Sequence, residues 1–195
     1  FSGEQAIRSA TQAAALFRSL GQVANEGRAL WVVAAANNDL GHGAVANQAA
    51  GDALALGRSC GDLYGVGRAL NMLTFGEADL GTNLKLLSQA LAAFEAAGYL
   101  VGQSRITSNL GFAYQSLGLY RRARRLYVKA EEFYRATGLV DRVYSVLELA
   151  TAEMEMGHFK AARAYLAEAA AAVAAIPQDR FLHFYMPMMF GRMAM

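Results

Sequence analysis

The sequence predicts an all-α protein, built as a right-handed superhelical solenoid of antiparallel helix pairs. Two observations carry this prediction. Glycines recur at regular intervals along the 195 residues, and the segments between them are rich in alanine and leucine, which favour helix. Proline, which interrupts helices, occurs only at Pro177 and Pro187, so long helices are permitted over nearly the whole chain.

The glycines form two interleaved series. One series, with spacings of 40, 37 and 39 residues, consists of Gly41, Gly81, Gly118 and Gly157. The other, with spacings of 40, 37 and 40 residues, consists of Gly21, Gly61, Gly98 and Gly138. Glycine closes helices because it adopts a positive φ without a steric penalty. Each interval is therefore predicted to be one helix, and successive helices alternate as the A and B members of a pair.

Apolar residues keep fixed offsets from the first glycine series in every copy. Twelve residues after the glycine stand Ala53, Ala93, Ala130 and Ala169. Nine residues after it stand Ala50, Ala90, Tyr127 and Leu166, and five after it stand Ala46, Leu86, Ala123 and Ala162. Directly before it stand Leu40, Leu80, Leu117 and Met156. We expect the small residues between the two helices of a pair and the larger ones between pairs.

This pattern resembles the tetratricopeptide repeat (TPR). The third copy carries the fullest signature, at Leu110, Gly111, Tyr114, Ala123, Tyr127 and Ala130. The period exceeds the usual length of about 34 residues. It is similar to the longer repeats of bacterial signalling proteins, such as maltose-regulator-like activators of the LuxR type and TPR-containing nucleotide cyclases. The resemblance covers residues 4–176 and implies a protein-binding module. A HEAT or armadillo array is the structural alternative.

The repeat frame divides the chain into a single solenoid, residues 1–195. Its expected parts are a helix B over 4–20, four pairs over 22–60, 62–97, 99–137 and 139–176, and the helix A of a fifth pair over 179–195. The chain begins without methionine, and each end helix would leave an apolar stripe uncovered. We therefore expect a fragment of a larger protein, with any catalytic domain outside it.

The composition argues against several classes of protein. Hydrophobic residues make up 55% and charged residues 17%, which is unlike a disordered chain. A net charge of +2 does not favour nucleic acid as a partner. The sequence shows neither a membrane-spanning apolar run nor a signal peptide. Cys60 is the single cysteine, so no disulfide forms within the chain, and a cytoplasmic location is expected.

Residues for catalysis or metal binding form no convincing set. His42 and His158 follow turn glycines, lack a second histidine or cysteine nearby, and are expected in solvent. Residues 57–61 match G-x-S-x-G, but the string closes a helix instead of following a strand, so Ser59 is not expected to be a nucleophile. Cys60 is expected to be half-buried. The sequence thus predicts no enzyme, no cofactor and no metal.

Helix A of each pair carries candidate binding residues on the side of the concave groove. Arg28, Arg68 and Arg105 each lie thirteen residues before a glycine of the first series. Arginines placed in this way suit a carboxylate, a phosphate or an acidic peptide. The alternative is solvation, or pairing within the chain with Asp39, Glu77 or Asp79.

An aromatic row is expected to accompany the arginines in the groove, formed by Trp31, Phe75 and Phe112. Peptide-binding surfaces use such aromatic anchors with polar neighbours, although core packing is an equally common use. The complete predicted site is Arg28, Trp31, Asn38, Arg68, Asn71, Phe75, Arg105, Ser108, Phe112 and Gln115. The family's carboxylate clamp is not implied, because Trp31 and Ala35 stand at two of its positions.

The sequence therefore predicts a non-catalytic protein- or peptide-binding module, the sensory or regulatory region of a larger bacterial signalling or transcription-regulating protein. A structural self-association module, acting through the apolar segment 181–195, is the alternative. Neither a membrane nor nucleic acid is an expected partner. The basic run from Arg121 to Lys129 is expected to be a solvated face of a B helix.

Overall fold

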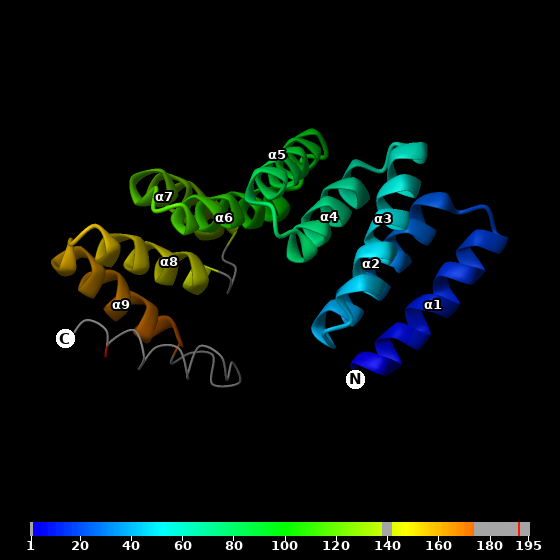
Figure 1. The fold of residues 1–195 in the computed structure, drawn as a ribbon, viewed down its shortest axis with the longest axis horizontal. Helices are drawn as coiled ribbons and strands as arrows, with labels where there is room; N and C mark the ends of the chain where they lie inside the picture. Colours follow the sequence, from blue (N-terminus) through cyan, green and yellow to red (C-terminus); the bar gives the residue numbers. More distant parts are fainter. Residues whose placement is uncertain (1, 138–141, 174–190, 192–195) are drawn as a thin grey trace. The chain divides into compact units, whose positions relative to one another are not determined.

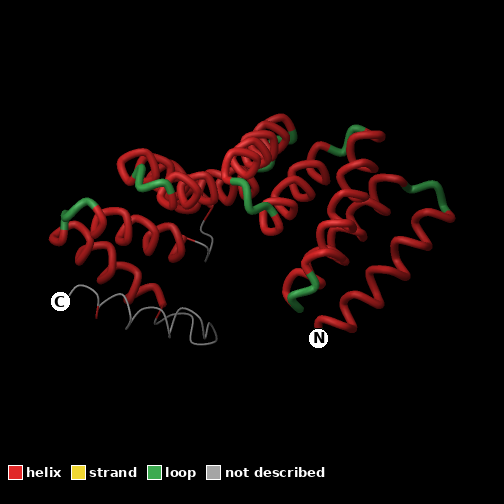
Figure 2. Tube along the Cα trace, in the orientation of Figure 1, coloured by secondary structure: helices red, strands yellow, loops and turns green. Residues whose placement is uncertain are grey.

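The structure, a computed structural model, describes residues 2–137, 142–173 and 191. Over these residues all regular secondary structure is helical (Figure 2), which confirms the predicted all-α class. No helix within these limits is long and apolar enough to cross a membrane. The fifth A helix expected over 179–195 lies outside the described residues apart from residue 191.

Nine α-helices and one 3-10 segment follow one another along the described chain (Figure 1). They are α1 (Gly3–Ser19), α2 (Val23–Asp39), α3 (Gly43–Cys60), α4 (Leu63–Leu73), η1 (Thr74–Gly76), α5 (Leu80–Ala96), α6 (Leu100–Ser116), α7 (Tyr120–Thr137), α8 (Arg142–Glu155) and α9 (Phe159–Val173). The chain separates into two compact units, Phe1–Ile106 and Thr107–Met195, and the division falls within α6.

Turn glycines end the helices at six of the predicted places. Their φ angles lie between 64° and 78°, at Gly21, Gly41, Gly61, Gly98, Gly118 and Gly157. The prediction is wrong for Gly81, which is the second residue of α5. There the 3-10 segment η1 closes α4 early, and the Asp79 carboxylate caps α5 by accepting a hydrogen bond from the Thr82 amide. Gly138 lies outside the described residues.

The first unit is a run of helices packed in sequence order. Each of α1 to α4 contacts the next helix, and the A helices α2 and α4 also contact each other. One buried cluster joins α1 to α4 and consists of Ala10, Val33, Ala34, Ala49, Ala50 and Met72. Small side chains dominate it, so the helices approach closely and present the same face of each A helix along the unit.

The second unit packs larger side chains. Tyr127 is fully buried, and a Cβ on Gly111 would lie 2.5 Å from its ring. The glycine of the third copy therefore makes room for the tyrosine. The alanines expected between paired helices are at most 1% exposed, which confirms their predicted burial: Ala123, Ala130, Ala162 and Ala169. Leu40 and Leu117, directly before turn glycines, are exposed instead, because the helix has already turned away from the core there.

Candidate ligand-binding site

Four of the predicted groove residues lie together in the first unit. A cavity of about 270 Å³ is lined by Trp31 of α2, Arg68 and Asn71 of α4, and Arg105 of α6. Its remaining lining residues are Tyr64, Phe94, Tyr99, Val101 and Gly102. Three successive A helices thus contribute to one hollow, and none of its lining residues is acidic. We refer to it as the Arg68 cavity.

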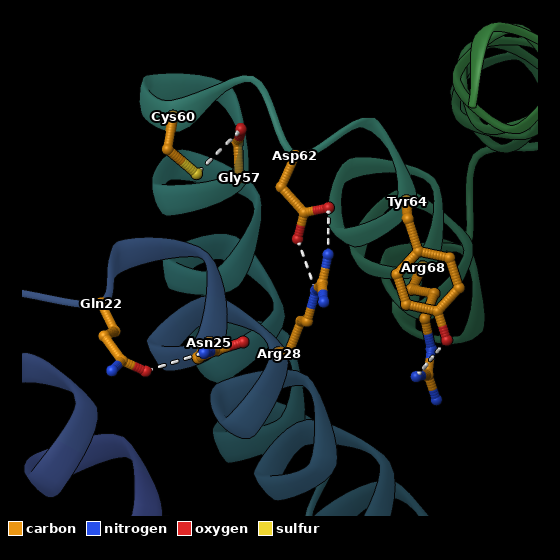
Figure 3. Close-up of polar contacts among 8 residues, drawn as sticks. All are labelled: Gln22, Asn25, Arg28, Gly57, Cys60, Asp62, Tyr64 and Arg68. Atoms are coloured by element: carbon orange, nitrogen blue, oxygen red, sulfur yellow. Dashed lines mark hydrogen bonds and ion pairs between the residues drawn. The ribbon is translucent and has the colours of Figure 1, made fainter.

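Arg68 is held in place by contacts on two sides. Its guanidinium carbon lies 3.2 Å from the centroid of the Trp31 ring. Its Nη1 donates a hydrogen bond of 2.8 Å to the Tyr64 hydroxyl, as Figure 3 shows. Trp31 Nε1 in turn donates to the main-chain carbonyl of Arg68, at 3.2 Å. Stacking on an aromatic face is favourable for arginine and fixes the plane of the guanidinium.

A cluster of three aromatic rings supports the wall of this cavity. The centroids of Tyr64 and Tyr99 lie 4.9 Å apart with the rings nearly perpendicular, and those of Phe94 and Tyr99 lie 5.5 Å apart. A Cβ on either Gly67 or Gly102 would lie 2.7 Å from the Phe94 ring. These two glycines leave the space that the ring fills. The Tyr64 ring, whose hydroxyl accepts the hydrogen bond from Arg68, is therefore packed against both Phe94 and Tyr99.

The Arg68 guanidinium is partly buried and lies near a second cation, Arg105. Burial lowers the pKa of the guanidinium below its ordinary value, Tyr64 and Tyr99 act in the opposite direction, and the nearby charge of Arg105 lowers the pKa further. No carboxylate among the described residues pairs with Arg68. An arginine remains protonated at any practical pH. The cavity therefore holds a partly desolvated positive charge.

Arg28, by contrast, is paired within the chain. Its Nε and Nη2 donate to the two carboxylate oxygens of Asp62, at 2.8 and 2.9 Å (Figure 3). The bond from Arg28 lowers the pKa of Asp62, and the same bond raises the pKa of Arg28. Arg28 therefore pairs with Asp62, and not with Asp39, Glu77 or Asp79, the partners considered from the sequence. Arg28 does not line the Arg68 cavity.

Three more of the predicted site residues lie outside the cavity. Phe75 is 60% exposed on η1, because α4 ends at Leu73 and the 3-10 turn breaks the continuity of the helix face. Phe112 is also 60% exposed, on the part of α6 that belongs to the second unit. Asn38 is half-buried in the last turn of α2, and its carbonyl accepts a hydrogen bond from the Gly41 amide. The three aromatic residues therefore have different surroundings.

Ser108 and Gln115 make internal hydrogen bonds in the second unit. Ser108 is 7% exposed and donates to the Glu148 carboxylate, and Gln115 accepts a hydrogen bond from the Tyr127 hydroxyl at 3.3 Å. Burial raises the pKa of Glu148 to about 7, against the opposing effect of the Ser108 bond. Glu148 was not singled out from the sequence, where it looks like any other helical glutamate.

A network of ionisable side chains surrounds Glu153, near the C-terminal end of α8. Glu153 is 2% exposed, receives a hydrogen bond from Arg124 of α7, and has Nδ1 of His158 at 2.7 Å. Burial raises the pKa of Glu153, but the bonds from Arg124 and His158 outweigh this effect and leave the pKa below its ordinary value. His158 lies in the turn before α9 with its side chain 61% exposed, as expected, and its ring also contacts the buried Glu153 carboxylate.

A larger cavity of about 560 Å³ lies at the helix turns of the second unit, and it contains none of the predicted residues. Its lining consists of Gly118, Leu119, Tyr120, Arg121, Arg122, Arg125, Glu155, Met156 and His158. Its arginines are accompanied by the acidic Glu155. The smaller Arg68 cavity, in which basic groups stand without an acid, is the stronger candidate for a ligand site.

The remaining residues considered for chemistry are ordinary in their surroundings. His42 lies in its turn with Nδ1 3.3 Å from the Asn37 amide oxygen. Cys60 is exposed, contrary to expectation, because it lies in the last turn of α3, with its sulfur 3.7 Å from the Gly57 carbonyl (Figure 3). Within the described ranges no group of histidine, cysteine and acidic residues is suited to hold a metal ion.

Comparison with protein-family models found no match, and neither did comparison with curated proteins. Several solved structures have the same fold. The apo form of RapI gives a TM-score of 0.72 at 14% identity, covering 77% of this chain and 57% of RapI. A Rap protein complexed with Competence and Sporulation Factor gives 0.75 at 16% identity, covering 82% of this chain and 46% of that protein.

A third similar structure is a signal-transduction ATPase of the STAND class from Pyrococcus horikoshii, which has a tetratricopeptide repeat sensor. It gives a TM-score of 0.69 at 18% identity, covering 82% of this chain and 26% of that protein. This chain thus spans about half of the length of the two Rap structures. At these identities the comparisons establish the fold, which is a TPR-like helical-repeat solenoid.

Proposed function

We propose that this chain is a non-catalytic module that binds a protein or peptide in the groove of its A helices. The observation that carries the proposal is the Arg68 cavity, to which three successive A helices contribute. One structural neighbour was solved with a bound factor and another has a TPR sensor, which supports a regulatory role. We further propose that the module is the sensory region of a larger bacterial signalling protein in the cytoplasm.

The energetic cost of Arg68 argues that the cavity is functional. Removing a charge from water is unfavourable unless an opposite charge compensates, and none is present among the lining residues. An apolar side chain of similar length would pack on Trp31 without this cost. A fold maintained for stability alone has no reason to keep the arginine, whereas a binding site does. The lining is arginine, asparagine and aromatic groups, which hold ligands and do not readily transfer protons at neutral pH.

A selection from a display library of random peptides tests this function. We expect the wild-type chain to enrich peptides and the double variant Arg68→Met, Trp31→Leu to bind them at least about tenfold more weakly. Arg58→Met is the matched control, because Arg58 is exposed on the B helix α3 and loses the same charge. The Phe75→Ala variant should also retain binding, since Phe75 does not line the cavity.

Two results would contradict the proposal. One is a failure of the wild-type chain to enrich any peptide, and the other is equal weakening by the Arg58 and Arg68 variants. Melting temperatures of all variants must be measured alongside, so that loss of binding is separated from loss of fold. An Arg68 variant that keeps its melting temperature and still binds normally would remove the cavity from the function.

Self-association is the second candidate, and exposed apolar residues on α1 favour it. Leu16 and Leu20 are 58% and 59% exposed at the C-terminal end of this helix. Sedimentation of the chain with and without residues 179–195, and of the variant Leu16→Lys, Leu20→Lys, measures this property. A mass of one chain in all three cases would reject self-association, whereas a dimer lost in either variant would support it.

A further inference from the structure

Two arginines occupy the same position in successive repeats but have different surroundings. Arg28 is the sixth residue of α2 and Arg68 is the sixth residue of α4. Both helices follow a turn glycine with positive φ, which is Gly21 before α2 and Gly61 before α4. The two side chains are therefore matched in register, and a difference between them reflects their neighbours.

The neighbours that differ are Asp62 and Tyr99. Each directly follows a turn glycine, and each side chain lies against a glycine three residues further on. A Cβ on Gly65 would lie 2.5 Å from the Asp62 carboxylate, and one on Gly102 would lie 2.6 Å from the Tyr99 ring. The two positions are thus equivalent in the fold. The second pair begins with a carboxylate that binds Arg28 of the first pair, whereas the third pair begins with a tyrosine that lines the cavity with Arg68 of the second pair.

The donors of the two guanidinium groups are used differently. Arg28 binds Asp62 through Nε and Nη2. Arg68 donates through Nη1 to Tyr64, and its Nε and Nη2 bond to no residue that the structure describes. The edge of the guanidinium that matches a carboxylate is therefore occupied in Arg28 and open in Arg68.

We propose that the Arg68 cavity binds a carboxylate of a peptide ligand, in the fork geometry in which Arg28 binds Asp62. The carboxylate comes from an aspartate or glutamate side chain or from the free C-terminus of the peptide. Arg105 adds positive charge to the cavity, and Tyr64 and Tyr99 contact the apolar part of the same ligand residue. This inference rests on the peptide-binding function proposed above and names the chemistry of its ligand.

The variant Tyr99→Asp tests the inference, because it copies the carboxylate at the start of the second pair to the equivalent position at the start of the third pair. The new aspartate should pair with Arg68 and exclude the ligand. Tyr99→Asn is the matched control, since it removes the same ring and leaves the charge unchanged. We expect Tyr99→Asp to melt at a higher temperature than Tyr99→Asn and to bind the selected peptides at least about tenfold more weakly.

A second experiment identifies the chemical group of the peptide that the cavity binds. Two libraries of short random peptides, one with amidated and one with free C-termini, are selected on the wild-type chain. Peptides that share an acidic residue in both libraries indicate a side-chain carboxylate, and selection confined to the free-acid library indicates the C-terminus. Changing that residue to its amide should weaken binding about tenfold. Trp31, the single tryptophan, reports binding by its fluorescence because it contacts Arg68.

The outcomes separate this inference from the function on which it rests. Equal binding by Tyr99→Asp and Tyr99→Asn, or selected peptides without any required carboxylate, would overturn the carboxylate site and leave peptide binding intact. A wild-type chain that selects no peptide from either library would overturn both.

Discussion

Each of the two compact units contains ion pairs and also a partly or fully buried charged group that no opposite charge among the described residues compensates. In the first unit Arg28 is paired with Asp62, whereas Arg68 has no carboxylate partner within the described residues. In the second unit Glu153 is paired with Arg124, and Glu148 is bonded only to a serine among the described residues. The group without a partner is a cation in one unit and a carboxylate in the other. A repeat fold therefore keeps its backbone regular while each unit presents different chemistry.

This difference indicates which charged groups stabilise the fold. Paired groups stabilise only while both partners remain, because removing one partner leaves the other buried and uncompensated. Groups without an opposite charge cost stability in the isolated chain, so their removal should be neutral or stabilising. Four substitutions of single residues examine this contrast, from the largest expected effect to the smallest.

Replacing Arg124 with methionine should cause the largest loss. Glu153 would remain 3% exposed by side chain, with only His158 near its carboxylate. We expect a decrease of about 3 kcal/mol in the free energy of unfolding at neutral pH, measured by urea denaturation. The double variant Arg124→Met, Glu153→Gln should recover much of it. No recovery in the double variant would show that Arg124 acts by packing instead of by charge.

Replacing Glu148 with glutamine should stabilise the chain, and only at higher pH. The pKa of Glu148 is about 7 in the folded chain, against an ordinary value of 4.5, so the folded chain binds more protons between these values. Wild-type stability therefore falls as the pH rises from 4.5 to 7. We expect equal stability of both proteins at pH 4.5 and a gain of about 2 to 3 kcal/mol for the variant at pH 8. Parallel stability curves across this range would contradict the raised pKa.

Replacing Arg28 with methionine should cost less than replacing Arg124, about 1 to 2 kcal/mol, because the side chains of Arg28 and Asp62 are both more exposed, at 46% and 8%, than those of the Arg124 pair, at 41% and 3%. The measurement is again the free energy of unfolding. High salt should reduce the difference between wild type and variant, since it screens the pair. A loss that salt leaves unchanged would point to packing on Tyr64, whose ring lies 5.4 Å from the guanidinium carbon.

Replacing Arg68 with methionine should have the smallest effect on folding. The variant loses the stacking on Trp31 and the bond to Tyr64, but it also loses the cost of burying a charge without a counter-ion. We expect a change within about 0.5 kcal/mol of zero. A loss as large as that of the Arg124 variant would show that Arg68 serves the fold, and would weaken the case for a binding site.

The sequence predicted those features that repeat. Turn glycines and buried alanines such as Ala130 recur at fixed offsets, and the structure places them as expected. Gly81 deviated because the 3-10 segment and the Asp79 cap replace its turn. Asp39 stands at the same offset in the first copy but is the last residue of α2, so the residue type alone did not indicate the cap.

For the candidate site, periodicity predicted the residues on one helix face, including Arg68 and Trp31, which meet in the structure. Tyr64 was not predicted, although it lies four residues before Arg68 on the same face of α4 and accepts its hydrogen bond. Tyr99 was not predicted because its place in the cavity depends on packing against residues of other helices, Tyr64 and Phe94. A signal for Tyr99 was nevertheless present. Asp62 and Tyr99 both directly follow a turn glycine, and a comparison of the two copies at that offset shows the exchange of an acid for a tyrosine.

The packing of each helix against its neighbour in sequence has a consequence for how the chain acquires its structure. In the first unit α1 contacts α2, α2 contacts α3, and α3 contacts α4, so most contacts close only short loops. Short loops cost little entropy to close, and chains dominated by local contacts fold rapidly. Because each helix depends mainly on its neighbours in sequence, folding of such a chain can begin at any helix pair and extend from there to the adjacent pairs.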